Sequence, residues 1–277
     1  MPELPVVQAL SERLDTLLGG QELTAVDPVG FSGLKTVEPP PHTFIGKGLR
    51  SVGSTGKYLV FDFDGGRILV HLSQGGRIVL EEPPKRTRPK AAVVRLVFGA
   101  TTGILLREYG TERKAGWWVL AEGDPGPLEK LGPDPRSDEF AAFVLGGGDT
   151  RRVHTWLRDQ RTVAGIGRGL SDDILHRARL SPYTALPKLG DDERKRLLDA
   201  TLATIDAALE AERTRSGGLP PKLSENFTVH GRYGTPCPTC GEGLRRVSYE
   251  SHEVTYCPAC QTGGKVLADR RMSRLVK

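Results

Sequence analysis

Residues 237–260 read CPTCGEGLRRVSYESHEVTYCPAC and contain all four cysteines of this 277-residue chain. Two Cys-x-x-Cys pairs separated by sixteen residues match the spacing of a tetrahedral zinc site on a two-hairpin scaffold. We expect this segment to bind one structural zinc ion, because four protein ligands leave no open coordination position for chemistry. The expected ligands are Cys237, Cys240, Cys257 and Cys260. The alternative is a pair of disulfides in a secreted domain, but the amino terminus lacks the layout of a secretory signal.

Basic residues flank this segment and recur in the middle of the chain. The net charge is +5 and the pI about 9.1, a mild excess that is ordinary for a soluble protein. After the last cysteine, five basic residues face one acidic residue, and a second cluster comprises Arg151, Arg152, Arg158 and Arg161. Two basic patches, one beside the cysteine pairs, favour a nucleic-acid partner over a merely solvated surface. Because no run of about 18 apolar residues occurs, we expect no membrane helix and a cytoplasmic location.

The rest of the chain divides into a β-rich part and a helical part. Apolar residues at helical spacing predict a helix over 6–18, and short β-rich runs separated by Gly and Asp turns predict a sandwich or barrel over about 22–120. We expect strands at 58–63, 67–72, 93–98 and 103–107. Helices are expected at 138–145, 151–159, 171–178 and 191–211, the third of them capped by Ser171. Gly- and Pro-rich stretches at 124–135 and 216–221 divide the chain into expected domains 1–123, 136–215 and 228–277.

A glycine turn separates the second and third expected helices. The segment Val163-Ala-Gly-Ile-Gly167 lets the backbone approach a ligand closely, and the amides that open the next helix can bind an anion. Arg161 and Arg168 flank the turn and favour a phosphate. An ordinary tight turn between two helices remains the alternative.

Five motifs, taken in order, resemble one family across nearly the whole chain. They are Met1-Pro-Glu-Leu-Pro5, Gly56-Lys-Tyr-Leu59, His71-Leu72 followed by Gly76, Leu157-x-Asp-Gln160 with the glycine turn, and Tyr256-Cys-Pro-Ala-Cys-Gln261. The chain resembles the formamidopyrimidine-DNA glycosylase / endonuclease VIII family, and its Pro-Glu-Leu-Pro start lies closer to the first branch. The resemblance implies an α+β multidomain fold: an N-terminal helix plus β-sandwich, a helix-two-turn-helix domain and a C-terminal zinc-finger β-hairpin. It also implies base-excision chemistry on damaged DNA.

The resemblance assigns catalysis to Pro2, Glu3 and Lys57. Once Met1 is removed, the secondary amine of Pro2 would attack the sugar C1′ carbon, and its pKa lies far below that of a lysine. Glu3 would act as general acid/base, and Lys57 would assist base loss and β-elimination. The ordinary alternative for Lys57 is a solvated surface lysine.

The resemblance also assigns DNA contacts. Three side chains would fill the gap left by a flipped-out base: Gln74, Arg107 and Tyr109. Tyr109 has an alternative role as a core aromatic. Further DNA contacts are expected from His71, Arg151, Arg161, Gly167, Arg168 and His252.

Several residues depart from the family pattern. Val6 and Gln8 replace acidic residues, Gln74 replaces a methionine, and Arg168 replaces an asparagine that holds a phosphate. His252 replaces an arginine that grips phosphates and assists δ-elimination, and histidine is shorter and mostly neutral at pH 7. Residues 214–222 do not match the loop that covers an oxidised purine in the family, which leaves oxidised pyrimidines and abasic DNA open as substrates.

The expected function is that of a bifunctional DNA glycosylase/AP lyase of base excision repair. It would act as a monomer on double-stranded DNA that contains damaged bases or abasic sites. The alternative is a damaged-DNA or DNA-structure binding protein on the same scaffold with weak or no glycosylase activity. A third interpretation, a zinc-ribbon module that binds RNA or protein, leaves the amino-terminal motif unexplained.

Overall fold

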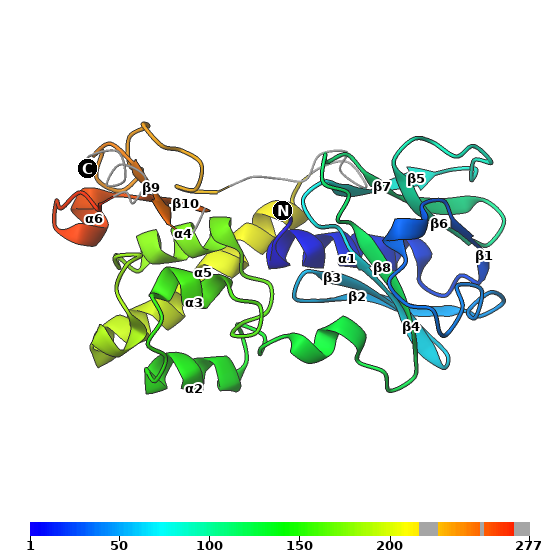
Figure 1. The fold of residues 1–277 in the computed structure, drawn as a ribbon, viewed down its shortest axis with the longest axis horizontal. Helices are drawn as coiled ribbons and strands as arrows, with labels where there is room; N and C mark the ends of the chain where they lie inside the picture. The colour runs from blue at the N-terminus through cyan, green and yellow to red at the C-terminus, as the bar shows by residue number, and fades with distance from the viewer. Residues whose placement is uncertain (216–226, 250–251, 269–277) are drawn as a thin grey trace. The chain divides into compact units, whose positions relative to one another are not determined.

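The computed structural model describes residues 1–215, 227–249 and 252–268 (Figure 1). The chain divides into two compact units. Unit 1 contains residues 1–130 together with 209–224, and unit 2 contains residues 131–208 together with 225–277. The helical segment and the cysteine hairpin therefore both fall in unit 2, and the three-domain division expected from the sequence stays a prediction.

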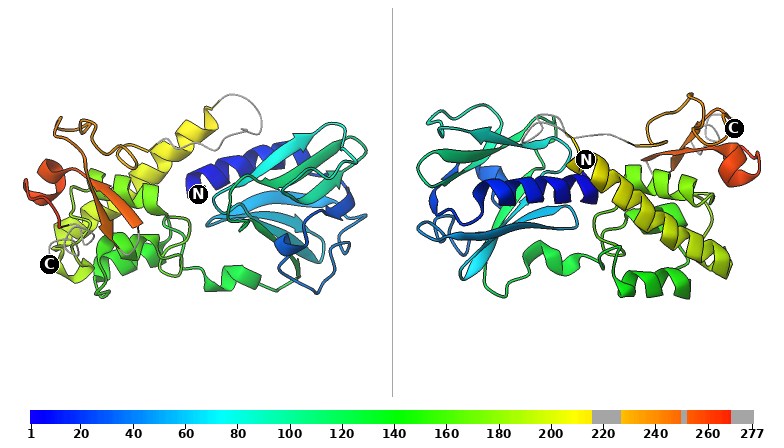
Figure 2. Two further views of the ribbon diagram at one scale, coloured as in Figure 1. Left: turned by 45° about the horizontal axis from the view of Figure 1, so that its top comes forward. Right: turned by 180° about the vertical axis from the view of Figure 1, so that it is seen from behind.

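The first helix of unit 1, α1 (Leu4–Leu18), begins directly after Glu3 and ends at Gly19. Pro5 is favourable in the first turn, where its missing N–H would have no helical partner. The helix packs against strands β2 (Leu49–Thr55) and β3 (Tyr58–Phe63) (Figure 2). The residues that it buries in the core are Val7, Leu10, Leu14 and Leu18. The helix predicted over 6–18 is confirmed.

Two antiparallel four-stranded sheets complete unit 1. The first has the order β2 (Leu49–Thr55), β3 (Tyr58–Phe63), β4 (Gly66–His71) and β8 (Gly116–Ala121). The second has the order β1 (Leu23–Pro28), β6 (Ala92–Phe98), β7 (Thr102–Glu108) and β5 (Gly76–Glu81). One apolar core joins the two sheets; it includes Phe61 and Ile68 of the first and Leu96 and Ile104 of the second. This arrangement confirms the sandwich.

The sequence predicts hairpin turns at 64–66 and 99–103, and these segments join β3 to β4 and β6 to β7, although β4 already begins at Gly66 and β7 at Thr102. Strands β1, β2, β5 and β8 are not singled out by the sequence. Gly53 in β2 and Gly76 in β5 weaken the local β pattern, so pairing with a neighbouring strand determines these segments. Short 3-10 turns η1 (Phe31–Gly33) and η2 (Gly126–Lys130) lie in the connections.

The carboxyl end of the last long helix, α5 (Asp191–Arg213), belongs to unit 1. Arg213 donates to both carboxylate oxygens of Glu12 on α1, at 2.8 and 2.6 Å. Arg13 donates to the backbone carbonyls of Glu212 (2.6 Å) and Arg215 (2.8 Å). These contacts fasten the end of α5 to α1.

Unit 2 contains α2 (Asp138–Gly146), α3 (Val153–Arg158), α4 (Arg168–Arg177), the 3-10 turn η3 (Leu186–Lys188) and most of α5. Ser137 caps α2 by accepting the Phe140 N–H. The Phe140 and Trp156 rings stack at 5.7 Å in the core of this unit. All four predicted helices are present.

The predicted cap of α4 is wrong. The helix begins at Arg168, with Gly167 at the cap position, rather than at Ser171. Ser171 is buried in the first turn and donates its hydroxyl proton to the Gly167 carbonyl at 2.5 Å. A serine inside the first turn of a helix can donate to the carbonyl four residues earlier. A serine followed by apolar residues therefore did not mark the first residue of α4.

The cysteine segment forms a β-hairpin and a short helix. Strands β9 (Arg245–Tyr249) and β10 (His252–Tyr256) pair antiparallel, and α6 (Pro258–Thr262) follows. Within the described residues, no helix is both long and apolar enough to cross a bilayer.

Candidate active site and metal centre

The four cysteine sulfurs converge at the base of the hairpin. They lie within 4.8 Å of one another, with 3.9 Å between Cys237 and Cys260 and 3.5 Å between Cys240 and Cys257. All four are free cysteines, so the disulfide alternative is wrong. Tetrahedral ligation with metal–sulfur bonds of about 2.3 Å requires sulfurs about 3.8 Å apart. The four thiols therefore fit one metal ion that has no open coordination position.

Side chains around the cluster hold its ligands in place. Burial alone raises the pKa of the Cys237 thiol, but hydrogen bonds from the Thr239 N–H and from His176 outweigh it, and the pKa falls to about 6. His176 Nε2, on α4, lies 3.1 Å from the Cys237 sulfur. Gln261 accepts the Cys257 N–H at 2.8 Å and donates to the Leu180 carbonyl at 2.9 Å. Support of this kind orients metal ligands.

The three expected catalytic residues are buried in unit 1. Pro2 and Glu3 directly precede α1, and the Glu3 side chain is only 6% exposed. Lys57 follows Gly56 in the two-residue turn between β2 and β3 and is 5% exposed. Gly56 has φ +58°, a conformation that glycine adopts freely. Lys57 is therefore not a solvated surface lysine, although its position alone does not test its catalytic role.

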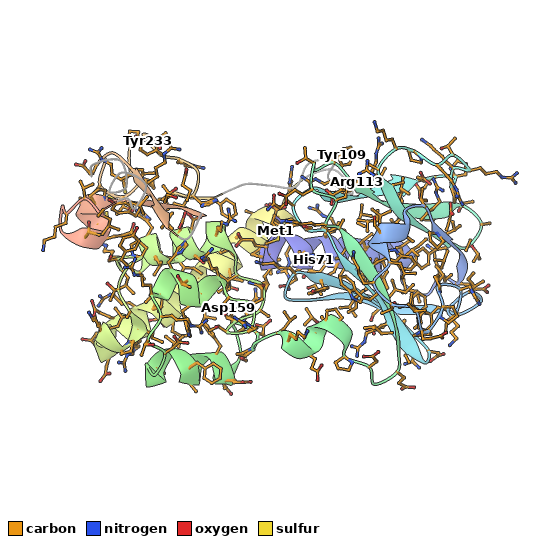
Figure 3. The ribbon with its side chains drawn as sticks, viewed as in Figure 1. Met1, His71, Tyr109, Arg113, Asp159 and Tyr233 are labelled. Carbon is orange, nitrogen blue, oxygen red and sulfur yellow. The ribbon has the colours of Figure 1, made fainter. Side chains whose placement is uncertain are left out.

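His71 lies at the end of β4, where it pairs with Tyr58 and its ring is 4.8 Å from the Tyr58 ring (Figure 3). Burial, with a smaller contribution from the positive charge of Lys57, lowers the pKa of His71 to about 4. At neutral pH His71 is therefore uncharged. Its ring can take part in a hydrogen bond but provides no positive charge.

We expect His71 to titrate near pH 4 in the folded protein, which NMR of the imidazole nitrogens can measure. Replacing Lys57 by Met should raise this pKa only partly toward 6.5, because burial is the larger cause. Since the folded pKa lies below the unfolded one, the stability contributed by neutral His71 is lost as pH falls from about 6.5 to 4. A His71 that titrates near 6.5 in the wild-type protein would contradict this assignment.

Gln74, Arg107 and Tyr109 lie around one junction between strands of unit 1. Gln74 is exposed in the turn between β4 and β5, and the Tyr109 N–H donates to the carbonyl of the next residue, Gly75, at 2.8 Å. The Arg107 guanidinium lies over the Tyr109 ring, 5.0 Å from its centroid. Tyr109 is 58% exposed, so the alternative of a core aromatic is wrong. An exposed ring under a cation can stack on a base.

Glu108 supports this junction and was missed by the sequence analysis. Its buried carboxylate accepts the N–H of Gly110 and of Ala115, each at 2.9 Å, and so closes the loop that follows Tyr109. The only sequence signal was an acidic residue between two expected DNA contacts.

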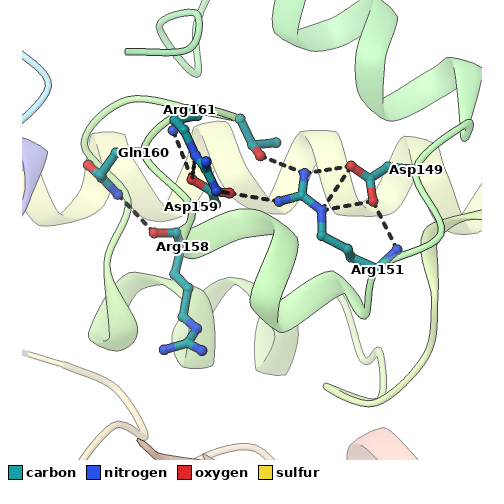
Figure 4. A network of polar contacts seen from close by, with 7 residues as sticks. Asp149, Arg151, Arg158, Asp159, Gln160 and Arg161 are labelled. Carbon is teal, nitrogen blue, oxygen red and sulfur yellow. Dashed lines mark hydrogen bonds and ion pairs between the residues drawn. The ribbon is translucent and has the colours of Figure 1, made fainter. Parts of the chain in front are cut away.

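In unit 2, Arg151 and Arg161 share one carboxylate (Figure 4). Asp159 lies 2.8 Å from Arg151 and 3.0 Å from Arg161, and Asp149 adds a second partner to Arg151 at 2.5 Å. The Arg161 guanidinium, which donates to Asp159, lowers the pKa of this carboxyl group to about 2. The side chain of Arg161 is 79% exposed. These two acids offset the two arginines, so the basic cluster is weaker than the sequence suggests.

The glycine turn is held by Gln160. Its amide donates to the carbonyl of Arg158 (Figure 4). It also donates to the Ile166 carbonyl and accepts the Gly165 N–H at 3.0 Å. Gly165 has φ +92°, which disfavours any other residue. The turn delivers Gly167 to the cap of α4 and Arg168, which is exposed, to its first position. The positive end of the helix dipole lies there.

The expected DNA contacts thus gather in separate groups. Those of unit 1 lie along the ends of β4, β5 and β7. Those of unit 2 lie just before α3, at the glycine turn and in the hairpin. His252 is the first residue of β10 and pairs with Tyr249 across the hairpin. Its side chain lies outside the described residues.

A two-sheet sandwich, a helix-two-turn-helix unit and a four-cysteine hairpin on one chain define a class of DNA-repair folds. The formamidopyrimidine-DNA glycosylase N-terminal domain matches residues 1–118, and the formamidopyrimidine-DNA glycosylase H2TH domain matches residues 131–217. The formamidopyrimidine-DNA glycosylase of Thermus thermophilus is 31% identical over 282 residues, covering 95% of this chain and 100% of that enzyme. The chain therefore belongs to the formamidopyrimidine-DNA glycosylase family.

Other relatives agree with this membership. An uncharacterized formamidopyrimidine-DNA glycosylase-like protein of Mycobacterium tuberculosis is 41% identical over 159 residues, which cover 56% of this chain and 99% of that protein. Among solved structures, Lactococcus lactis Fpg with DNA containing an abasic site has a TM-score of 0.83 at 22% identity, covering 94% of this chain and 99% of the other. MutM with DNA containing carbocyclic 8-oxo-G has a TM-score of 0.81 at 22% identity, covering 94% and 100%. At this identity the two structures show the fold.

Proposed function

We propose that the protein is a bifunctional DNA glycosylase/AP lyase that excises oxidised bases from double-stranded DNA. The observation that carries the proposal is that a member of this family keeps Pro2, Glu3 and Lys57, all three buried, at the start of α1 and in the β2–β3 turn. Solved relatives in complex with abasic-site and 8-oxo-G DNA support the class of substrate.

The proposed chemistry starts at the nitrogen of Pro2 after removal of Met1. The free amine attacks C1′ of the damaged nucleotide, the glycosidic bond breaks and the base leaves with a proton supplied through Glu3. The nitrogen of Pro2 then loses its own proton, the C1′–O4′ bond of the sugar breaks with O4′ taking up a proton through Glu3, and a C=N bond forms between Pro2 and C1′. The resulting iminium ion acidifies the C2′ proton, and its loss expels the 3′ phosphate by β-elimination. Lys57 would supply a cation that stabilises the sugar and phosphate. Water then releases Pro2.

The remaining residues would hold DNA. Gly167 and Arg168 combine backbone amides at a helix start with a guanidinium, a pairing suited to phosphate. Arg107 and Tyr109, with Gln74, would support the base left without a partner. We propose zinc as the ion held by the four thiols, because an S4 tetrahedral site suits Zn²⁺.

Borohydride trapping tests the proposal. Hydride reduces an iminium ion to a stable amine, so the wild-type protein should form a covalent adduct on a duplex with an abasic site. Duplexes with 8-oxoguanine or an oxidised pyrimidine should then show which base is excised. Tight binding to abasic DNA without any adduct between pH 6 and 8 would instead favour a DNA-structure binding protein.

The product of strand cleavage tests His252. Because histidine is shorter than arginine and mostly neutral at pH 7, we expect β-elimination product to predominate over δ-elimination product. Replacing His252 by Arg should raise the δ share several-fold, measured by gel separation of the cleaved ends. His42, an exposed histidine of unit 1 in the described structure, provides the control His42→Arg. An unchanged ratio in His252→Arg would contradict the assignment.

A further inference from the structure

Helix α4 connects the glycine turn to the cysteine hairpin through its buried polar side chains. Its first residue, Arg168, is exposed beside the turn, whereas Asp172 and Asp173, one turn further along, are 1% and 5% exposed. A carboxylate buried this deeply is costly unless hydrogen bonds compensate it. Both residues and all their partners described below belong to unit 2.

Asp172 binds the backbone of the hairpin. Its Oδ2 accepts the N–H of Thr255 in β10 at 3.0 Å and lies 2.6 Å from Nδ1 of His230. Its Oδ1 lies 3.2 Å from Nε2 of His154 on α3. His154 is 2% exposed, and in the described structure this last contact lacks the alignment of a hydrogen bond. One carboxylate thus contacts the hairpin, the segment that enters it and a neighbouring helix.

Asp173 binds residues 228–230, which lead into the cysteine hairpin, independently of Asp172. Its Oδ2 accepts the Thr228 N–H at 2.6 Å, and its Oδ1 accepts those of Val229 at 2.8 Å and His230 at 3.2 Å. Three consecutive N–H groups around one carboxylate hold a backbone in a single conformation. Asp172 is therefore the one of the two acids that reaches strand β10 itself.

We propose that Asp172 is a positioning residue for DNA binding, which sets the spacing between the glycine turn and the start of strand β10. Arg168 precedes Asp172 by four residues, about 6 Å along the helix. His252 precedes Thr255 by three residues, about 10 Å along the strand. The Asp172–Thr255 hydrogen bond therefore links α4, which begins at Arg168, to β10, which begins at His252. Both of these first residues are expected phosphate contacts. This inference rests on the proposed function, since both contacts serve damaged DNA.

The test compares Asp172→Ala and Asp172→Asn with Asp199→Ala, an exposed aspartate on α5 in the same unit. We expect Asp172→Ala to weaken binding to a duplex with a tetrahydrofuran abasic analogue at least 10-fold. The rate of borohydride trapping on abasic DNA at saturation should stay within 3-fold, because the proposed nucleophile lies in unit 1. Asn keeps an oxygen that can accept the Thr255 N–H, so Asp172→Asn should weaken binding less than 3-fold. Asp199→Ala should match wild type.

Hydrogen exchange of the free, metal-loaded protein gives a readout that does not depend on activity. The Thr255 amide should exchange at least 10-fold faster in Asp172→Ala, with one metal ion per chain retained. If Asp172→Ala does not fold, Asp172→Asn provides the test: hydrogen exchange of the Thr255 amide should be faster than in wild type by a smaller factor, about 3-fold. Unchanged affinity and exchange would overturn the inference, as would equal losses of binding and of saturated trapping. A wild-type protein that forms no adduct contradicts the proposed function alone, since affinity and exchange still test Asp172.

Discussion

Replacing Pro2 by Gly is expected to lower the yield of borohydride-trapped adduct on abasic DNA at least 10-fold. Proline provides a secondary amine that forms a cationic iminium directly, whereas a glycine terminus provides a mobile primary amine without the ring that fixes its direction. A fused residue in front of Pro2 should abolish the adduct, because it turns the reactive nitrogen into an amide. The measurement is the fraction of labelled DNA in the covalent complex at saturating protein.

The matched control is Pro5→Ala, which changes a proline of the same motif that cannot become the terminal amine. Pro5 lies in the first turn of α1, so its replacement should leave the adduct within 3-fold of wild type. DNA affinity should change little in Pro2→Gly. Equal trapping by Pro2→Gly, by the protein with the fused residue and by wild type would place the nucleophile elsewhere, with Lys57 as the next amine to test.

Removing the metal is expected to cause the second large effect, a loss of DNA affinity of at least 100-fold. The apolar core of the hairpin consists of two small clusters. One contains Val229 and Leu244 with the cysteines Cys237 and Cys257, and the other contains Val247, Val254 and Tyr256. A core of this size cannot fold the segment alone, so metal binding supplies its folding free energy. Cys237→Ser should lose the ion and the protection of the β9–β10 amides. The strands of unit 1 should keep theirs, because their core is separate.

Thr239→Ser is the control for this change, since Thr239 lies between two ligands and is exposed. Metal content per chain, amide exchange and affinity for abasic DNA give the three readouts. If Cys237→Ser or the chelated protein bound DNA as tightly as wild type, the hairpin would have no part in DNA binding. Full restoration of affinity by added Zn²⁺ is expected for the chelated wild type.

The parts of the fold that local pattern determines could be predicted from the sequence. Helix α1, the β3–β4 and β6–β7 hairpins and the cysteine cluster each combine a regular spacing with clear turn residues. Strands β2 and β5, which contain glycine, depend on pairing, β2 with the next strand β3 and β5 with β7, which lies beyond β6 in the chain. The start of α4 was misplaced because a backward-bonded Ser171 resembles a cap in sequence.

The candidate site was predictable in its residue types and not in their electrostatics. The motif predicts a DNA contact at His71 but not that burial beside Lys57 makes this side chain neutral. The arginine cluster is strongly basic in sequence, but in the structure Asp149 and Asp159 form ion pairs with Arg151 and Arg161 and offset their charge. Asp172 carries no motif of its own, and its bond to Thr255 joins residues 83 positions apart.

The fastening of α5 to α1 limits how the protein can be divided. A fragment that stops at Lys130 would contain every strand of the sandwich and still lack residues 209–215, which pack as part of the same unit. Arg13 would lose its two carbonyl acceptors and Glu12 its arginine. A free-standing unit 1 therefore needs residues 209–215, at the end of the helical segment, in addition to residues 1–130. Limited proteolysis that separates the two units should leave this peptide bound to residues 1–130.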